Sequence, residues 1–399
     1  MKFFHISDLH IGKQLYGYNL AGDQEHVLKQ IEAALETEEP DALLLTGDIY
    51  DKPVPSGEAV HMFDRFLTEI STRCPDLKIM MIAGNHDAAR RIDYASDILS
   101  HHNIHIAGTP PQRSDDFIRR VTVPDAEGEV HFYLLPFFKP ANLRGLFSEE
   151  ENEMYCSEAK ERGVSEYEVY FERLLAREKI DRTKRNVLLT HQFFLGGNGK
   201  EPERTDSEIM TVGTLDHISS RSLEPFDYVA MGHLHRPQKC GKEIYRYCGT
   251  PMPYSLSEEN DKKSVTVVTL EAPGKEARIE TIGLKPLRRI KRLRGSKEEL
   301  IHLAAGDGNA DAYVSLVVTD DEPGRYVREE LAACYSHILE IQIDNRYMQS
   351  LLKEAPEMGL SDNYFEMFEK FYSMSNGKAM SEEESRIIAE IMTDMEDER

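Results

Sequence analysis

The sequence predicts a layered α/β protein that continues into a second, smaller α/β unit and a pair of C-terminal helices. Two observations support this fold class. In the first half of the chain, short apolar runs alternate with stretches of helical periodicity, an order typical of layered α/β domains. After Glu271 the composition changes, and a strongly basic stretch precedes a new series of helical and apolar segments.

Buried strands and amphipathic helices follow one another in the first 135 residues. The run at 42–46 is continuously apolar, which is typical of a strand that is buried on both faces. In chain order, we expect a strand at 2–7, a helix at 23–38, strands at 42–46 and 78–83 around a helix at 58–71, a helix at 93–101, and strands at 104–107, 117–123 and 131–135.

The remaining elements are separated by two stretches of unusual charge. Residues 149–178 carry ten acidic and four basic side chains and predict a solvated helical insertion. Residues 285–297 carry seven basic side chains and no acidic one. We expect strands at 186–190, 228–231, 244–248 and 264–271, then helix 297–305, strand 312–319, helix 326–336, strand 339–343 and helices at 363–374 and 381–396.

Composition excludes several classes of protein. With 399 residues, 40% of them hydrophobic, the chain is long enough for two or three globular domains. It contains no run of about 18 apolar residues and no N-terminal signal-peptide pattern. Its five cysteines are widely spaced and form no Cys-x-x-Cys pair, so we expect a cytoplasmic protein without disulfides or a zinc finger. The net charge of −23 by itself argues against nucleic-acid binding.

Five short polar motifs each follow a predicted strand or apolar run. They are Asp8-Leu9-His10, Gly47-Asp48, Gly84-Asn85-His86-Asp87, His191 and Gly232-His233-Leu234-His235. Open α/β sheets place their sites at the carboxyl ends of strands. Carboxylate, amide and imidazole groups are suitable ligands for divalent metals such as Mn, Fe or Zn. The sequence therefore predicts a metal site, with Asp51, Asp87 and Asp206 as candidates for orienting the histidines, or else as turn and cap residues.

These motifs resemble the calcineurin-like metallophosphoesterase superfamily. The resemblance implies a four-layer sandwich, with two mixed β-sheets flanked by helices, and a site for two metals. One metal would be held by Asp8, His10 and His235, and the other by Asn85, His191 and His233. Asp48 would bridge the two metals, and His86 would contact the scissile phosphate and assist the leaving oxygen.

Further segments are similar to the SbcD family of nuclease subunits. They are Gly47-Asp48-Ile49-Tyr50-Asp51, Ser207-Glu208, the Arg236-Pro237-Gln238 extension and Tyr247-Cys248-Gly249-Thr250-Pro251. This resemblance covers essentially the whole chain. It implies a nuclease domain at 1–280, a small α/β DNA-capping domain at 281–346 and a C-terminal helical partner-binding region at 347–399.

Membership in that family would imply a specific activity and partner. The activity would be a manganese-dependent, ATP-dependent double-strand 3'-5' exonuclease and a hairpin and single-strand endonuclease, acting in DNA repair, recombination and replication at the nucleoid. The partner would be an SbcC-type coiled-coil ATPase, with two copies of the chain in a heterotetramer. The chain has no Gly-x4-Gly-Lys-[Ser/Thr] loop, so ATP would have to be bound by that other chain.

Two sets of residues are candidates for contacts with DNA and with the partner. For DNA they are Arg90, Arg91, Arg288, Arg289, Lys291 and Arg292, although a helix cap or a solvated strand face explains them equally well. For the partner they are Phe365, Phe368, Phe371, Ile387 and Ile391, in helices that either pack on the body or dock on a coiled coil.

Two other functions remain open at this point. A small-molecule phosphodiesterase or protein phosphatase would use the same motifs, but it would need neither the chain beyond about residue 280 nor the Arg236-Pro237-Gln238 extension. A non-catalytic scaffold would require the loss of a ligand, and all seven predicted ligand positions are filled.

Overall fold

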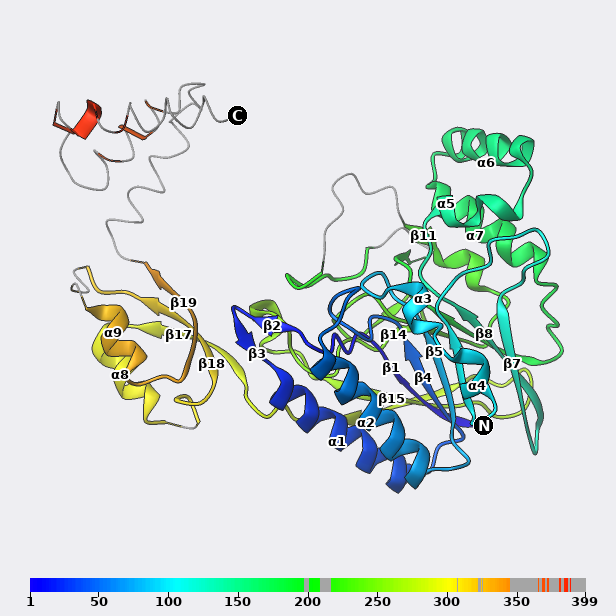
Figure 1. Cartoon of the computed structure of the whole chain (residues 1–399), viewed down its shortest axis with the longest axis horizontal. Helices are drawn as coiled ribbons and strands as arrows, with labels where there is room; N and C mark the ends of the chain where they lie inside the picture. Colours follow the sequence, from blue (N-terminus) through cyan, green and yellow to red (C-terminus); the bar gives the residue numbers. More distant parts are fainter. Residues whose placement is uncertain are drawn as a thin grey trace. The chain divides into compact units, whose positions relative to one another are not determined.

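A computed structural model describes most of the chain. The described residues are 1–196, 201–208, 217–306, 308–321, 324, 326–344, 365, 368, 369, 372, 380, 381, 384–386 and 388. The chain divides into two compact units, residues 1–291 and 292–399. Figure 1 shows the elements of both units.

The first unit begins with a six-stranded mixed sheet. Its order is β16 (Arg278–Gly283), β15 (Ser264–Thr269), β1 (Lys2–Ile6), β4 (Ala42–Thr46), β5 (Lys78–Ile82) and β6 (Ile104–Ala107). Strands β1, β4, β5 and β6 are parallel, whereas β15 and β16 add antiparallel strands at one edge. The carboxyl ends of β1, β4 and β5 therefore lie at the same edge of the sheet.

The second sheet also has six strands. Its order is β13 (Gln238–Cys240), β14 (Lys242–Tyr247), β12 (Tyr228–Met231), β9 (Arg185–Thr190), β8 (Gly128–Leu135) and β7 (Arg119–Asp125). The four central strands are parallel, and β13 and β7 are antiparallel to their neighbours. Every residue of β9 and β12 is buried, as expected for strands that are covered on both faces.

The two sheets pack face to face around an apolar core. Phe3 of β1 contacts Phe132 of β8 and Tyr228 of β12 edge to face, with ring centroids 5.7 and 5.6 Å apart. Leu44 and Val187 belong to the same core cluster. Because successive residues of a strand point to opposite faces, the alternate residues must be covered by other elements.

Helices cover the outer faces and complete four layers. On the first sheet lie α1 (Ala21–Glu38) and α2 (Gly57–Arg73), both with a buried apolar face (Figure 1). On the second sheet, a core cluster joins strand residues to α5 (Pro140–Leu143), α6 (Glu149–Arg162) and α7 (Glu166–Arg177). The four-layer arrangement of two mixed sheets flanked by helices is confirmed.

The charge-rich stretch at 149–178 is the helix pair α6 and α7. Ser148 caps α6 in a capping box with Glu151, and Gly163 ends the helix in the left-handed conformation. Only Tyr155 and Ala159 of α6 are buried, so most of this helix is solvated, as the sequence predicts.

The second unit contains a three-stranded sheet, β17 (Ile290–Gly295), β18 (Tyr313–Val318) and β19 (His337–Ile343), with β18 in the middle. Helices α8 (Lys297–Ala304) and α9 (Val327–Ala332) share an apolar cluster with this sheet. This is the small α/β unit that the sequence predicts. Of the predicted C-terminal helices, the described residues 365, 368, 369, 372, 384–386 and 388 are helical, residue 381 is described but not helical, and the other residues lie outside the described part of the chain.

Some expected elements differ from the structure. The helix expected at 93–101 is wrong as one element, because Ala95 adopts a φ of 59° and separates α3 (Ala89–Ile92) from α4 (Ser96–Ser100). The basic run is partly a strand, β17. The short strands β2 (Gln14–Leu15), β3 (Tyr18–Asn19), β10 (Phe194–Leu195) and β11 (Ile218–Ser219) and the edge strands β13 and β16 were not expected.

His5 connects the two sheets and makes the stability of the fold depend on pH. It is fully buried, with Nδ1 3.0 Å from the Tyr228 hydroxyl and Nε2 3.0 Å from the Thr46 hydroxyl. Burial lowers the pKa of His5 to about 3. The unfolded chain therefore takes up a proton near pH 6.5 that the folded chain does not, and stability is lost as the pH falls below this value.

We predict that His5→Gln reduces the pH dependence of stability. One proton contributes about 1.4 kcal/mol per pH unit, so the wild type should lose about 2 kcal/mol more than the variant between pH 6.5 and 5. Urea unfolding at a series of pH values measures this difference. His61→Gln, which changes an exposed histidine on α2, is the control and should follow the wild type. Equal slopes for His5→Gln and the wild type would contradict the prediction.

Candidate metal centre

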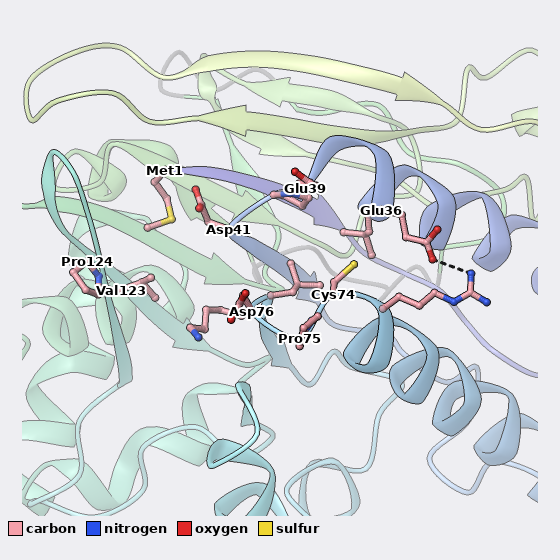
Figure 2. Close-up of a pocket in the computed structure, with 14 residues that line it drawn as sticks. Met1, Glu36, Glu39, Asp41, Cys74, Pro75, Asp76, Val123 and Pro124 are labelled. Carbon is pink, nitrogen blue, oxygen red and sulfur yellow. Dashed lines mark hydrogen bonds and ion pairs between the residues drawn. The ribbon is translucent and has the colours of Figure 1, made fainter.

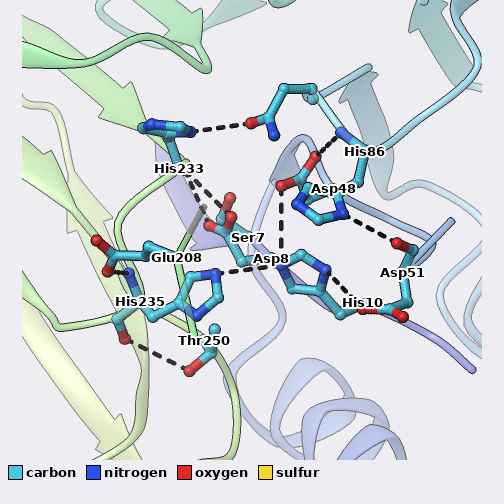
Figure 3. A network of polar contacts seen from close by, with 12 residues as sticks. Ser7, Asp8, His10, Asp48, Asp51, His86, Glu208, His233, His235 and Thr250 are labelled. Atoms are coloured by element: carbon cyan, nitrogen blue, oxygen red, sulfur yellow. Dashed lines mark hydrogen bonds and ion pairs between the residues drawn. The ribbon is translucent and has the colours of Figure 1, made fainter. Parts of the chain in front are cut away.

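The five polar motifs meet at one edge of the two sheets. Asp8 and His10 follow β1, Asp48 follows β4, and Asn85 and His86 follow β5. From the second sheet, His191 follows β9, and His233 and His235 follow β12. Figure 3 shows side chains from both sheets pointing toward one another. The structure thus brings together all eight side chains that the sequence predicts for the metal ligands and His86.

One group consists of Asp8, His10 and His235. Each side chain offers a ligand atom, and these atoms all lie within 4.8 Å of one another. The three residues are at most 2% exposed. The Nε2 atoms of His10 and His235 face each other at 3.1 Å. Two imidazole nitrogens at this distance must share a proton or both turn lone pairs toward a cation.

A second group surrounds Asn85. Its amide oxygen lies 2.9 Å from Nδ1 of His233 and 3.2 Å from Nε2 of His191. His191 is fully buried, and its Nε2 is also 3.2 Å from Oδ2 of Asp48. Ligand atoms of Asp8, Asp48 and His191 form a further cluster within 4.8 Å.

Asp48 lies between the two groups. Its Oδ2 is 3.2 Å from Nε2 of His191 and 3.7 Å from Nε2 of His10. Its Oδ1 accepts a hydrogen bond of 2.8 Å from the backbone N–H of His86. A carboxylate in this place touches ligands of both groups, which is what a bridging ligand requires.

Burial controls the protonation of the cluster. It raises the pKa of Asp8 to about 7. It also lowers the pKa of His10 and His235, and it lowers that of His233 to about 3, so these imidazoles are neutral and keep a lone pair. Burial would also lower the pKa of His191, but the neighbouring Asp48 carboxylate raises it to about 9.

The donor set fits divalent cations. The cluster offers two buried carboxylates, one amide oxygen and four imidazoles, which are hard and borderline ligands. Because most of these imidazoles are neutral, they do not supply enough positive charge to balance the carboxylates. The site also concentrates unusual backbone: Asp8, His10, Asp48 and His233 have φ values of 54°, 42°, 49° and 95°. Non-glycine residues rarely adopt such angles, and they gather at functional sites because the surrounding structure enforces them.

Hydrogen bonds fix two of the rings. Nδ1 of His191 donates to the Thr46 carbonyl at 2.6 Å, which leaves Nε2 facing Asp48 and Asn85. Nδ1 of His86 donates to the Asp51 carbonyl at 2.9 Å, and a ligand atom of His86 also lies within 4.8 Å of ligand atoms of His10 and Asp48.

The three aspartates expected to orient histidines behave differently. Asp51 orients His86 through its backbone carbonyl, whereas its Oδ1 lies 3.6 Å from Nδ1 of His10, too far for a hydrogen bond. Asp87 instead accepts hydrogen bonds from the backbone N–H groups of Ile49, Tyr50 and Gly84, so it joins the loops after β4 and β5. Asp206 is exposed, and its neighbour Ser207 contacts Nδ1 of His235 in its place. The alternative role of a turn residue therefore fits Asp87, and no hydrogen bond joins the Asp206 side chain to a histidine among the described residues.

Two of the motif glycines allow the loops to approach closely. A Cβ atom on Gly84 would lie 2.1 Å from Oδ1 of Asp48. A Cβ atom on Gly232 would lie 2.1 Å from the Thr46 carbonyl oxygen and 2.2 Å from Oγ of Ser7. No side chain fits there without displacing the loop that carries a predicted ligand.

The residues expected to contact DNA are at the surface but partly neutralised. Arg90 and Arg91 are exposed on α3. Arg288 pairs with the buried Asp23 at 2.8 Å, and Lys291 and Arg292 also have partners. Arg289 is exposed.

Among the residues expected to bind a partner, Phe365 and Phe368 are half-buried, whereas Phe371, Ile387 and Ile391 lie outside the described residues.

Sequence reasoning missed one cation near the centre. The guanidinium of Arg204 stacks on the ring of Phe193, 4.0 Å from its centroid. The same ring packs against His233, with centroids 6.4 Å apart. Within the part of the chain that the structure describes, no carboxylate pairs with Arg204. It follows a glycine-rich segment that has no recognisable motif, so the sequence alone gives no signal for it.

A pocket of about 560 Å³ lies elsewhere, where strands β1, β4 and β5 begin (Figure 2). It is lined by residues of both charges, such as Glu39, Asp41 and Lys78, together with Cys74 and Pro75. None of the predicted site residues lines it. Since the polar motifs follow the carboxyl ends of these strands, this pocket is at the other edge of the sheet and separate from the candidate centre.

Comparison with known families matches nearly the whole chain. Residues 1–237 match the family described as calcineurin-like phosphoesterase, and residues 284–376 match the type 5 capsule protein repressor C-terminal domain. A protein named as the SbcD component of the nuclease SbcCD, from Staphylococcus epidermidis, is 30% identical over 321 residues, 80% of this chain and 79% of that protein. Its namesake from Staphylococcus saprophyticus is 26% identical over 398 residues, 98% of each chain.

Solved structures show weaker likeness. A dimetal phosphatase from Danio rerio aligns with a TM-score of 0.39 and 12% identity, over 71% of this chain and 96% of that one. The protein TT1561 of Thermus thermophilus aligns with a TM-score of 0.36 and 11% identity, over 71% of this chain and 99% of that one. These scores are too low to support an inference about this chain.

Among the described residues, no helix is long and apolar enough to cross a membrane.

We predict that Asp48→Asn abolishes the binding of both metals. The variant loses a carboxylate that lies between the two groups of ligands and keeps the size of the side chain. Titration of the metal-free protein with Mn²⁺ by calorimetry measures the number of sites. Asp206→Asn makes the same change on an exposed residue and should bind like the wild type. Unchanged binding by Asp48→Asn would exclude a bridging role.

Proposed function

The chain belongs to the SbcD family of calcineurin-like phosphoesterases, and from this premise we propose that it is the nuclease component of an SbcCD-type complex that hydrolyses DNA phosphodiester bonds with two divalent metals. The observation that carries the proposal is the buried cluster in which two groups of ligands share Asp48. We assign Asp8, His10 and His235 to one metal, Asn85, His191 and His233 to the other, and Asp48 to both.

When bound, the two cations would polarise the phosphodiester and supply a nucleophilic water near neutral pH. The protein's own residues do the remaining work. The loops after β1, β4, β5, β9 and β12 hold the ligands in place, and the hydrogen bond from His191 to the Thr46 carbonyl selects Nε2 as its ligand atom. Strong burial of the cluster makes every charge in it more effective than it would be in water.

His86 is suited to proton transfer at the leaving oxygen. It is half-buried beside His10, with ring centroids 4.8 Å apart, and its backbone N–H is held by Asp48. Because Nδ1 is occupied by the Asp51 carbonyl, Nε2 is the nitrogen that gives or takes the proton. We therefore assign His86 to catalysis and not to metal binding.

DNA as the substrate is supported by features outside the metal cluster. The relatives are named as nucleases, and this chain continues into a second α/β unit that a small-molecule phosphodiesterase does not need. Arg204 offers a guanidinium without a carboxylate partner among the described residues, beside His233 and in a position to contact a phosphate. Exposed Arg90, Arg91 and Arg289 are further candidates for phosphate contacts.

The name of the relatives indicates an assembly of more than one kind of chain. We propose that this chain likewise acts with a coiled-coil ATPase of the SbcC type, as a homodimer within a heterotetramer, and that Mn²⁺ is its metal. The activity would be the ATP-dependent 3'-5' exonuclease on duplex ends and the endonuclease on hairpins and single strands, at the nucleoid during repair, recombination and replication. The C-terminal region at 347–399 would bind the ATPase, and the region at 281–346 would cap the DNA.

The first test is cleavage of a labelled linear duplex and a hairpin by the purified chain with Mn²⁺, with and without the ATPase partner and ATP. The proposal predicts cleavage that becomes stronger with the partner and ATP. Bis-p-nitrophenyl phosphate is the control substrate. Hydrolysis of this small diester with DNA untouched in both settings would keep the two-metal chemistry and exclude DNA as the substrate.

His86→Ala is expected to bind two Mn²⁺ ions normally and to cleave about 10²–10⁴-fold more slowly, the usual loss when one general acid or base is removed. Calorimetry and a cleavage assay on the same preparation separate the two effects. His102→Ala, at an exposed histidine after α4, should behave as the wild type. Loss of a bound metal in His86→Ala would place this residue among the ligands.

Deletion of residues 361–399 is expected to leave hydrolysis of the small diester unchanged and to abolish capture of the ATPase. The full-length chain on the same resin is the control. If the shortened chain still captures the ATPase, the partner is bound elsewhere.

A further inference from the structure

A buried ion pair lies behind His235. Glu258 is fully buried and Lys263 is 3% exposed, and the Lys263 ammonium lies 2.6 Å from Oε2 of Glu258. Removing two charges from water is costly, and an apolar pair of the same size often stabilises a protein equally well. The pair belongs to none of the five motifs, so its role has to be sought in what it contacts.

Lys263 holds the backbone of His235. Its ammonium contacts the His235 carbonyl at 2.8 Å, the Thr250 hydroxyl at 2.8 Å and Glu258, and a longer contact of 3.5 Å joins it to Asp261. The backbone N–H of Thr250 donates to the same His235 carbonyl at 3.1 Å. On the other side, the N–H of His235 donates to Oε1 of Glu208 at 2.9 Å. Both backbone groups of His235 are therefore fixed.

Glu258 holds the imidazole of His235 through Ser207. The Ser207 hydroxyl donates to Oε1 of Glu258 at 2.7 Å, and its oxygen lies 2.6 Å from Nδ1 of His235. Because the hydroxyl proton is directed to the carboxylate, the Ser207 oxygen accepts the proton of Nδ1. This selects the tautomer in which Nε2 carries the lone pair, and it is Nε2 that faces His10 at 3.1 Å.

We propose that Ser207, Glu258 and Lys263 are positioning residues that fix the backbone, ring orientation and tautomer of His235 for metal binding. This inference rests on the proposed function, since it gives the ion pair a purpose only if His235 holds a metal. The chain Glu258–Ser207–His235 would also increase the electron density at Nε2 and so strengthen the bond to a metal. His191 has a simpler support, a single backbone carbonyl, so the two metals should depend on this network unequally.

The principal test is Mn²⁺ binding by metal-free Ser207→Ala, measured by calorimetry. Wild type should bind two ions. Ser207→Ala should weaken one of them by about 10–100-fold, the usual effect of removing a partner of a metal-bound histidine, and leave the other unchanged. Ser207→Thr keeps the hydroxyl and should restore wild-type binding. Two ions bound with wild-type affinity by Ser207→Ala would overturn the inference, whereas a wild type that binds no Mn²⁺ would overturn the proposed function itself.

A matched control separates positioning from general stability. Glu258→Gln combined with Lys263→Met removes both charges of the ion pair at once. It should weaken the same metal site that Ser207→Ala weakens. Asp125→Asn combined with Arg185→Met makes a similar change in the pair of buried Arg185 and partly buried Asp125, at the amino end of β9; Asp125 also pairs with the N-terminal ammonium. The predicted ligand His191 follows the other end of this strand, so it is about 17–20 Å away from Arg185. Whatever the two doubles do to the melting temperature, only the first should weaken Mn²⁺ binding. Equal weakening in both would indicate a purely structural role.

Two further readouts test whether the network acts through His235. In the background of His235→Ala, adding Ser207→Ala should cause no further loss of Mn²⁺ affinity, because the residue it supports is already absent. In the metal-free wild type, nuclear magnetic resonance of ¹⁵N-labelled histidine should show the proton of His235 on Nδ1. A proton on Nε2, or an additional loss in the double variant, would contradict the assignment.

Discussion

The buried cluster of Asp8, Asp48 and their neighbouring imidazoles is the constraint on which the rest of this structure depends. Two carboxylates that are at most 2% exposed cannot keep their charges without compensation. In the metal-free protein, part of this compensation comes from the raised pKa of Asp8, which favours its protonation. Another part comes from the ion pair between Asp48 and His191, which raises the pKa of His191. Bound divalent cations would provide the rest, and this need for positive charge is the physical reason to regard the cluster as a metal centre.

The two-sheet architecture follows from the same requirement. The candidate ligands follow β1, β4 and β5 of the first sheet and β9 and β12 of the second, so neither sheet could build the proposed centre alone. The core between the sheets, with Phe3 against Phe132 and Tyr228, sets their separation. Gly84 and Gly232 allow the loops to converge, and Asp87 joins two of these loops through three backbone N–H groups. The unusual φ angles of four predicted ligands are maintained by this packing.

The sequence was informative where the pattern is local. Continuous apolar runs such as 42–46 and 228–231 identified the central strands to the residue, and a polar motif after a strand identified each side chain that the structure brings together at the candidate centre. Local patterns were insufficient for edge strands such as β13 and β16, which have fewer buried positions, and for β17, whose basic residues mask its alternation. They also could not reveal Glu258 and Lys263, because Glu258 contacts Ser207 across 51 residues of chain and only the folded structure brings them together.

The most direct test of the two-metal centre is the anomalous X-ray scattering of Mn²⁺ in crystals of the metal-loaded protein. We expect two manganese peaks about 3.5–4 Å apart. Asp48 should lie between them, His10 and His235 should contact one peak, and His191 and His233 should contact the other. A single peak, or two peaks without Asp48 between them, would contradict the two-metal centre and the mechanism that depends on it.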